Sequence, residues 1–150
     1  FFRKSGKPVL YSWLDPYGIG YHNLLISPKY DGCYMCMNYA DGRLVNNRAS
    51  FAEENQIFEK RLASCSSAFI PYNVTAPSSL ANKAIEIYLQ FMSGAFSIGN
   101  RLISMLGSGM RFEEEGFVYS DRYYSCLKDC QYLNVTLEKN LSCPECNGKY

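Results

Sequence analysis

Two Cys-x-x-Cys pairs, one towards each end of the sequence, constrain this chain more than any other feature. The first pair is Cys33 and Cys36, and the second is Cys143 and Cys146. A tetrahedral metal ion needs four soft ligands, and two such turns together can supply them. If the pairs share one site, most of the chain lies in a loop between them. The spacing therefore predicts a structural zinc site formed by Cys33, Cys36, Cys143 and Cys146.

The residues around the second pair suit a metal-binding turn. Pro144 fixes one backbone torsion, and Asn147-Gly148 can adopt the positive φ that the chain needs just beyond the second thiolate. The first pair has no such glycine, although Asn38 could adopt a left-handed conformation. Both pairs resemble the knuckles of zinc ribbons and rubredoxins. Those small folds have far shorter connections than the 106 residues between these knuckles, so the resemblance implies a metal-site geometry and not a family.

Disulfide bonds are the alternative to a metal site. The sequence contains seven cysteines, so at least one lies outside any intrachain disulfide. Cys126 and Cys130 lie four apart on one face of a predicted helix and are poorly placed to bond to each other. They could instead pair with two cysteines elsewhere, such as Cys65 and one of a Cys-x-x-Cys pair. N-glycosylation motifs favour this alternative, because glycans and disulfides both belong to secreted proteins. The motifs begin at Asn73, Asn134 and Asn140.

The sequence does not indicate catalysis. A redox-active Cys-x-x-Cys pair needs a helix directly after its first cysteine, and Asp41-Gly42 follows the first pair so soon that we expect no long helix there. His22 is the only histidine, and no local motif joins it to a nucleophile. The acidic residues 113–115 predict a solvated surface. We therefore expect neither an enzyme nor a small-molecule substrate.

Composition predicts a single folded domain over residues 1–150. Hydrophobic residues make up 47% of the chain and charged residues 19%, which suits a chain that buries a core. The net charge of +1 argues against a nucleic-acid partner. We expect an extended, aromatic-rich N-terminal arm over 1–48, a helical core over 49–133 and a cysteine-stapled tail over 134–150. Frequent Gly and Pro in the arm allow only short strands, near Val9–Trp13 and Leu24–Ile26.

Hydrophobic periodicity predicts a mainly α fold built on one long central helix over about 78–106. Small residues at 93–99 would either allow another backbone to approach this helix closely or break it. Its uncharged stretch is too short to cross a bilayer. Ser50 and Glu53 form a capping box for a second helix over 50–64. Ser120 caps a third helix, which extends to about residue 133.

These features together predict a non-catalytic structural or accessory subunit of a larger protein assembly. Its partners would be other protein subunits, with the 78–106 helix against a membrane or a membrane protein, because that helix has more apolar residues than one core-facing stripe needs. We favour an organellar, mitochondrial-type complex over an extracellular location. The alternative is a secreted or surface-exposed, disulfide-bonded glycoprotein domain that binds a receptor or ligand.

Overall fold

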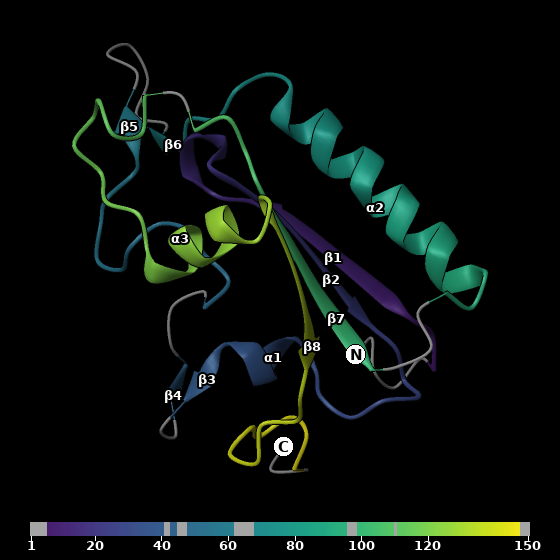
Figure 1. Cartoon of the computed structure of the whole chain (residues 1–150). Helices are drawn as coiled ribbons and strands as arrows, with labels where there is room; N and C mark the ends of the chain where they lie inside the picture. Colours follow the sequence, from purple (N-terminus) through teal and green to yellow (C-terminus); the bar gives the residue numbers. More distant parts are fainter. Residues whose placement is uncertain are drawn as a thin grey trace.

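A four-stranded antiparallel sheet forms the centre of the computed structural model (Figure 1). The structure describes residues 6–40, 43–44, 48–61, 68–95, 99–109 and 111–147. Along the sheet the strands follow the order β1-β2-β7-β8. Their bounds are Val9–Leu14 for β1, Gly20–Ile26 for β2, Asn100–Leu106 for β7 and Tyr132–Leu137 for β8. Strand β2 is paired on both sides and is buried throughout, so it is the core strand of the fold.

The first two strands form a hairpin because the chain between them reverses within a few residues. A 3-10 turn at Pro16–Gly18 connects them, and its Tyr17 and Gly18 have φ values of 58° and 68°. Glycine adopts such a left-handed conformation without steric cost. The pairing aligns Val9 with Ile26 and continues to the end of β1, so every residue of β1 has a partner in β2.

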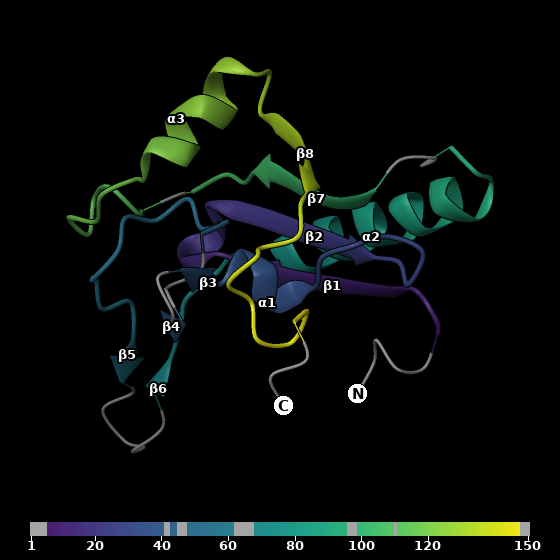
Figure 2. The same cartoon turned by 90° about the horizontal axis from the view of Figure 1, so that it is seen from below.

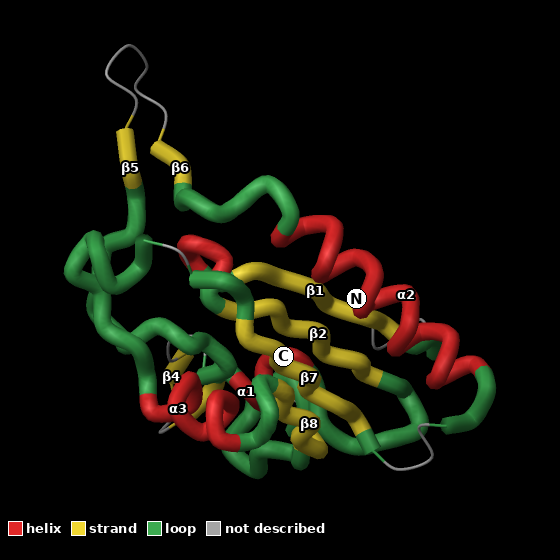
Figure 3. Tube along the Cα trace, turned by 45° about the horizontal axis from the view of Figure 1, so that its top comes forward, coloured by secondary structure: helices red, strands yellow, loops and turns green. Residues whose placement is uncertain are grey.

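Helix α2, Ala76–Met92, covers one face of the sheet on the side of β1 (Figure 3). The helix begins where the Asn73 side chain accepts a hydrogen bond from the Ala76 backbone N–H at 2.7 Å. Its fully buried Ile87 packs with Leu25 and Ile103, which point to this face from β2 and β7. A continuous apolar layer therefore joins α2 to the two central strands.

Short elements cover the opposite face of the sheet. Neighbouring residues in a strand point to opposite faces, so Leu24 and Leu102 point away from α2 and pack with Met37. Met37 belongs to α1, Tyr34–Met37, which lies beside the C-terminal segment (Figure 2). Helix α3, Asp121–Lys128, connects β7 to β8 and inserts its buried Cys126 into a mostly aromatic cluster at one end of this face.

Two further pairs of short antiparallel strands lie outside the central sheet. Strand β3, Tyr39–Ala40, pairs with β4, Arg43–Leu44. Strand β5, Lys60–Arg61, pairs with β6, Ala68–Phe69, and these two project away from the rest of the molecule (Figure 1). Neither pair adds a strand to the central sheet.

The prediction of a mainly α fold built on one long helix is wrong, because the structure is mixed and organised around a sheet. The predicted helix over 78–106 ends at Met92 in a Schellman motif. Gly94 has a φ of 80°, and the Ala95 N–H donates to the Gln90 carbonyl at 2.9 Å. Of the two roles that we considered for the small residues at 93–99, helix breaking is the one that the structure shows for residues 93–95, whereas residues 96–98 lie outside the described part.

The last seven residues of that predicted helix form β7 instead. Leu102 and Met105 satisfy a helical spacing of three, but they lie on opposite faces of the strand and join different hydrophobic clusters. Pairing with β2 and β8 on either side stabilises this segment as a strand. A short apolar run is ambiguous between helix and strand until its neighbours are known.

The predicted helix over 50–64 is also wrong in its described part, residues 50–61, and residues 62–64 lie outside the described residues. The capping box does not form, because the Glu53 N–H donates to the Val118 carbonyl at 2.9 Å. Two residues earlier, the Phe51 N–H donates to the Asp15 carboxylate at 2.7 Å. These long-range hydrogen bonds hold the segment in an irregular conformation.

The third predicted helix begins after Ser120 as expected, but it ends at Lys128. Cys130 and Gln131 follow with φ values of 55° and 65°, which end the helix, and residues 132–137 form β8. The short strands predicted near Val9–Trp13 and Leu24–Ile26 are present as β1 and β2. They are part of the central sheet, where we had expected an extended arm.

Candidate metal centre

The loop after β2 carries the first knuckle, Cys33–Cys36. A buried side chain at the start of β7, that of Asn100, holds this loop in place. Asn100 Oδ1 accepts a hydrogen bond from the Ser27 N–H at 2.8 Å, and its Nδ2 donates to the carbonyls of Asp31 and Gly32 at 3.0 and 3.2 Å. The sheet thus fixes the position of the chain directly before Cys33.

The segment after β8 carries the second knuckle, Cys143–Cys146. Asn140 connects the two knuckles, because its Nδ2 donates to the carbonyls of Cys36 and Tyr39. Asn147 donates to the Cys143 carbonyl from its backbone nitrogen at 3.2 Å and from its side chain at 2.9 Å. The Asn140 side chain therefore holds the two knuckles together, and Asn147 stabilises the turn of the second knuckle.

The backbone around the first knuckle differs from our expectation. Asn38 has a φ of −107°, so it does not adopt the left-handed conformation. The left-handed residue lies before the knuckle, where Gly32 has a φ of 97°. A Cβ atom on Gly32 would lie 3.4 Å from the carbonyl of Glu138, an ordinary van der Waals distance, so it is the positive φ that favours glycine here.

The two knuckles bring four sulfur atoms together. The Sγ atoms are 3.8 Å apart for Cys33 and Cys36, 3.7 Å for Cys33 and Cys143, and 3.3 Å for Cys36 and Cys146. All four lie within 4.8 Å of one another. Sulfurs bound at about 2.3 Å around a tetrahedral ion would be about 3.8 Å apart, whereas disulfide sulfurs are about 2.05 Å apart. This four-cysteine cluster could hold a metal ion, and the three separations exclude disulfides between those pairs.

Burial of the cluster disfavours the negatively charged thiolate form of its cysteines. Three of its cysteines are buried and Cys146 is half-buried. Desolvation by burial raises the pKa of the Cys33 thiol, and the hydrogen bond with Cys146 raises it further. Metal ligands are thiolates, so the deprotonated cluster would concentrate negative charge in a site with little water. A divalent cation would supply the compensating charge and favour the thiolate form.

The other candidate cysteines do not join this cluster. Cys126 is buried in α3, and Cys130 is exposed just beyond the end of that helix. Cys65 lies outside the described residues. Since Cys130 follows the end of α3, the two cysteines do not share a helix face as the sequence suggested.

The three glycosylation candidates lie in different surroundings. Asn134 is exposed on β8. The Nδ2 atom of Asn73 donates to Ser108 Oγ at 2.6 Å, and that of Asn140 donates within the metal centre. A glycan would be attached to this same nitrogen. At Asn73 and Asn140 it would therefore compete with hydrogen bonds that the fold uses.

A buried polar network, which we did not predict, lies on the same face of the sheet as the first knuckle. His22 Nε2 lies 2.8 Å from Asp15 Oδ2, and His22 Nδ1 lies 2.9 Å from Ser104 Oγ. Arg122 donates to the same hydroxyl at 3.0 Å. These residue types also form nucleophilic triads, but the Ser104 side chain is 0% exposed in this structure. The network links side chains of β2, β7 and α3 with Asp15, which follows β1.

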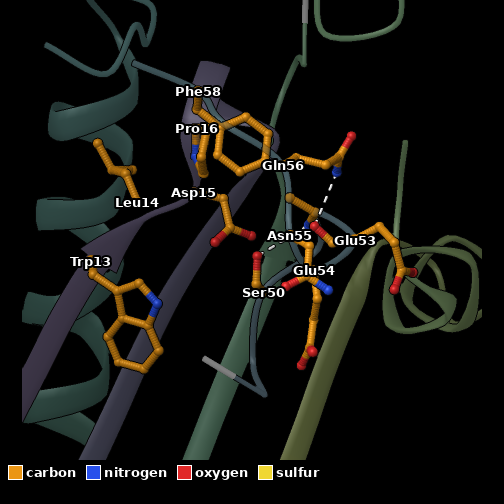
Figure 4. A pocket seen from close by; sticks show the side chains of 11 residues that line it. Trp13, Leu14, Asp15, Pro16, Ser50, Glu53, Glu54, Asn55, Gln56 and Phe58 are labelled. Carbon is orange, nitrogen blue, oxygen red and sulfur yellow. Dashed lines mark hydrogen bonds between the residues drawn. The ribbon is translucent and has the colours of Figure 1, made fainter. Parts of the chain in front are cut away.

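A hollow of about 420 Å³ lies beside this network and is lined partly by Asp15 (Figure 4). Glu53 and Glu54 add two carboxylates to its lining. The Asp15 Oδ2 atom is already bound to His22 and to the Phe51 N–H. That carboxylate oxygen holds the fold together and is not free for a ligand in the hollow.

Comparison of the chain with models of protein families, with curated proteins and with solved structures found no match. No helix among the described residues combines the length and the hydrophobicity that crossing a bilayer requires. The four-cysteine cluster is thus the feature of this chain whose chemistry is most clearly defined.

Proposed function

We propose that the chain is a non-catalytic structural subunit whose two knuckles bind one structural zinc ion. The four-cysteine cluster supports this proposal. Four cysteine ligands complete a tetrahedral shell, and a complete shell has no open position for water or substrate, which a catalytic zinc ion requires. Zinc at this place would link the loop after β2 to the segment after β8.

The choice of zinc follows from the type and number of the ligands. A tetrahedral set of sulfurs is typical of zinc or iron, and closed sites of four cysteines are common among structural zinc sites. The two ions differ in a simple observable: zinc has no d–d absorption, whereas iron bound to four thiolates is coloured. The identity of the ion can therefore be read from a spectrum and a metal analysis.

The subunit role has separate support in an exposed apolar surface on α2. Ile85, Leu89 and Met92 are 59, 61 and 63% exposed. Clustered exposed apolar residues mark contact sites on soluble proteins, so we propose that the chain acts by binding another protein. An organellar location stays a prediction. Membrane contact was predicted for a helix over 78–106, and the helix found here ends at Met92.

A disulfide-bonded glycoprotein domain is the second candidate function. The exposed position of Asn134 favours it, because a glycan could attach there. The sulfur separations in the four-cysteine cluster favour the metal site instead.

Intact mass and metal analysis separate these functions. We expect the native protein to contain one zinc per chain, and all seven cysteines to react as thiols after denaturation without reductant. Cys143→Ser should lose the zinc, whereas the control Cys130→Ser should retain it. A mass lower by pairs of hydrogen atoms, or higher by glycans, would overturn the zinc proposal in favour of the glycoprotein. A coloured protein that contains iron would overturn the choice of metal.

A further inference from the structure

Helix α2 presents an apolar flank beside its buried face. At 3.6 residues per turn, one side of the helix carries mostly apolar residues that do not belong to the buried face, with Ser78 as the polar exception. This apolar flank consists of Pro77, Ala81, Ile85, Tyr88, Leu89 and Met92. Its four large side chains are between 48 and 63% exposed. The helix therefore has more apolar surface than its own sheet covers.

The opposite flank of α2 is polar. Lys83 forms an ion pair with Glu86 at 2.9 Å, and Gln90 donates to Glu86 at 3.0 Å. Lys83 also lies 5.3 Å from the centre of the Tyr132 ring on β8. The polar flank thus faces the β8 side of the sheet, and the apolar flank faces the β1 side.

A groove of about 590 Å³ lies between the apolar flank and β1. A charged group entering this groove would lose water without gaining an ion pair, because none of the lining residues is charged. The charge pattern therefore selects an apolar, uncharged partner. The lining consists of Ser12, Trp13, Leu14, Tyr72, Pro77, Leu80, Ala81, Ala84 and Ile85.

Strand β1 is the edge of the sheet beside this groove. Within the described part of the chain it pairs with β2 alone, so the other side of its backbone can accept a further strand. Edge strands are usually protected by a charge, a proline or a bulge. The residues of β1, Val-Leu-Tyr-Ser-Trp-Leu, include neither a charged residue nor a proline.

We propose that a second copy of this chain binds here, with β1 of one copy antiparallel to β1 of the other. A twofold axis perpendicular to the sheet would place both α2 helices on the same side, where their apolar flanks would meet. The chain supplies both surfaces that such a partner needs, an uncharged extended strand and an apolar helix flank. The two sheets would join into one continuous sheet.

The exposed area fits a dimer. The side chains concerned are Tyr72, Ile85, Tyr88, Leu89 and Met92, which are 56, 59, 48, 61 and 63% exposed. With about 200 Å² for each large side chain, they expose roughly 570 Å² together. A stable interface buries about 800 Å² on each partner, and the edge of β1 and the groove can supply the remainder.

This inference rests on the proposed role as a protein-binding subunit and names the partner, but it does not depend on zinc. The first knuckle packs on the face of the sheet opposite α2. Zinc content and oligomeric state can therefore be measured as independent properties of the same sample. A protein without zinc could still form the dimer, and a monomeric protein could still contain zinc.

Native mass spectrometry and sedimentation across a range of concentrations test the dimer. We expect the full chain to form a dimer. Leu89→Glu and Ile85→Glu should each raise its dissociation constant by about a hundredfold or more, because the twofold axis places two unpaired charges in one interface. Ile57→Glu is the matched control, since Ile57 is 82% exposed on a different part of the molecule and its substitution should leave the dimer unchanged.

Hydrogen exchange then tests the position of the interface. The amides of β1 should exchange more slowly in the dimer than in the Leu89→Glu monomer, whereas those of β8, at the other edge of the sheet, should not change. A stable dimer has a dissociation constant well below about 100 μM. If the wild-type protein were still a monomer at that concentration, the proposal would be overturned. A dimer that both glutamate variants leave intact would overturn it as well. Binding of a monomeric wild type to phosphatidylcholine–phosphatidylglycerol vesicles, lost in Leu89→Glu, would replace the second copy with a membrane.

Discussion

At the scale of single residues, Asn100 shows how the sheet and the four-cysteine cluster are connected. Its side chain is 1% exposed, and its hydrogen bonds go to the loop that leads into Cys33. Residues that position metal ligands contribute to metal affinity even though they do not touch the ion. Asn100, the first residue of β7, thus connects this strand to the loop that positions the first knuckle.

We expect Asn100→Ala to weaken both folding and zinc binding. The substitution leaves the Ser27 N–H and the Asp31 carbonyl without their partner, which should lower the free energy of unfolding by about 2–4 kcal/mol. Zinc affinity should fall about tenfold or more. Urea unfolding and competition with a chromophoric chelator measure the two effects. Asn134→Ala, at an exposed residue of β8, is the control, and equal behaviour of the two variants would contradict this role of Asn100.

The sequence predicts the cysteines of the cluster, because a Cys-x-x-Cys turn is a local pattern with its own chemistry. It does not predict Asn100, since 68 residues separate it from Gly32 and nothing near it in sequence suggests a metal. The same holds for the buried network, in which His22 and Ser104 are 82 residues apart. Positioning residues of this kind are recognised only once the strands are aligned.

At the scale of elements, local patterns predict where several segments begin but not which structure they form. Helix α3 begins after Ser120 where expected, but the Ser120 side chain does not cap the helix and donates to the Ser50 carbonyl instead. In the described part of the helix predicted over 50–64, residues 50–61, no helix forms because Asp15 and Val118 bind its first backbone donors. These partners lie far away in sequence, so the capping box is overridden by the tertiary fold.

The end of β7 offers a prediction about close packing between elements. A Cβ atom on Gly107 would lie 1.8 Å from the Gly18 carbonyl oxygen, and a backbone atom cannot easily move away. Gly107→Ala should therefore destabilise the protein by about 3 kcal/mol or more, as measured by urea unfolding. Gly116→Ala is the control, because a Cβ atom there would meet nothing within 4 Å. Its free energy of unfolding should fall by only about 1 kcal/mol, owing to the positive φ of 83°. Similar losses for both variants would argue against the close approach.

At the scale of the whole molecule, the four-cysteine cluster connects segments that are distant in sequence. Cys33 and Cys143 are 110 residues apart. The chain between them includes β7, which pairs with β2, and β8, which forms the edge of the sheet opposite β1. The mixed fold could not be deduced from periodicity, because pairing of β2 with β7 is a long-range property.

Since the cluster joins two distant segments, the stability of the two knuckles should depend on the bound ion as well as on the sheet.

Removal of zinc should destabilise the protein and free the first knuckle. We expect a strong chelator to lower the melting temperature by about 10 °C or more, reversibly on addition of zinc. Trp13, the only tryptophan, provides a signal, since its ring lies 6.3 Å from that of Tyr34 inside the knuckle. Its fluorescence should change as the knuckle detaches. An unchanged melting temperature and emission after complete removal of the ion would contradict a structural role.

The distance in sequence between the knuckles has a consequence for how the protein is made. Cys33 and Cys36 leave the ribosome long before Cys143 and Cys146, so for most of synthesis the chain has only two of the four cysteines of the proposed zinc site. Two thiolates hold zinc far more weakly than four. Complete coordination would therefore come after translation of residue 146, and a chain interrupted earlier would fail to retain the ion. The bound metal would mark the molecules in which these two segments have met.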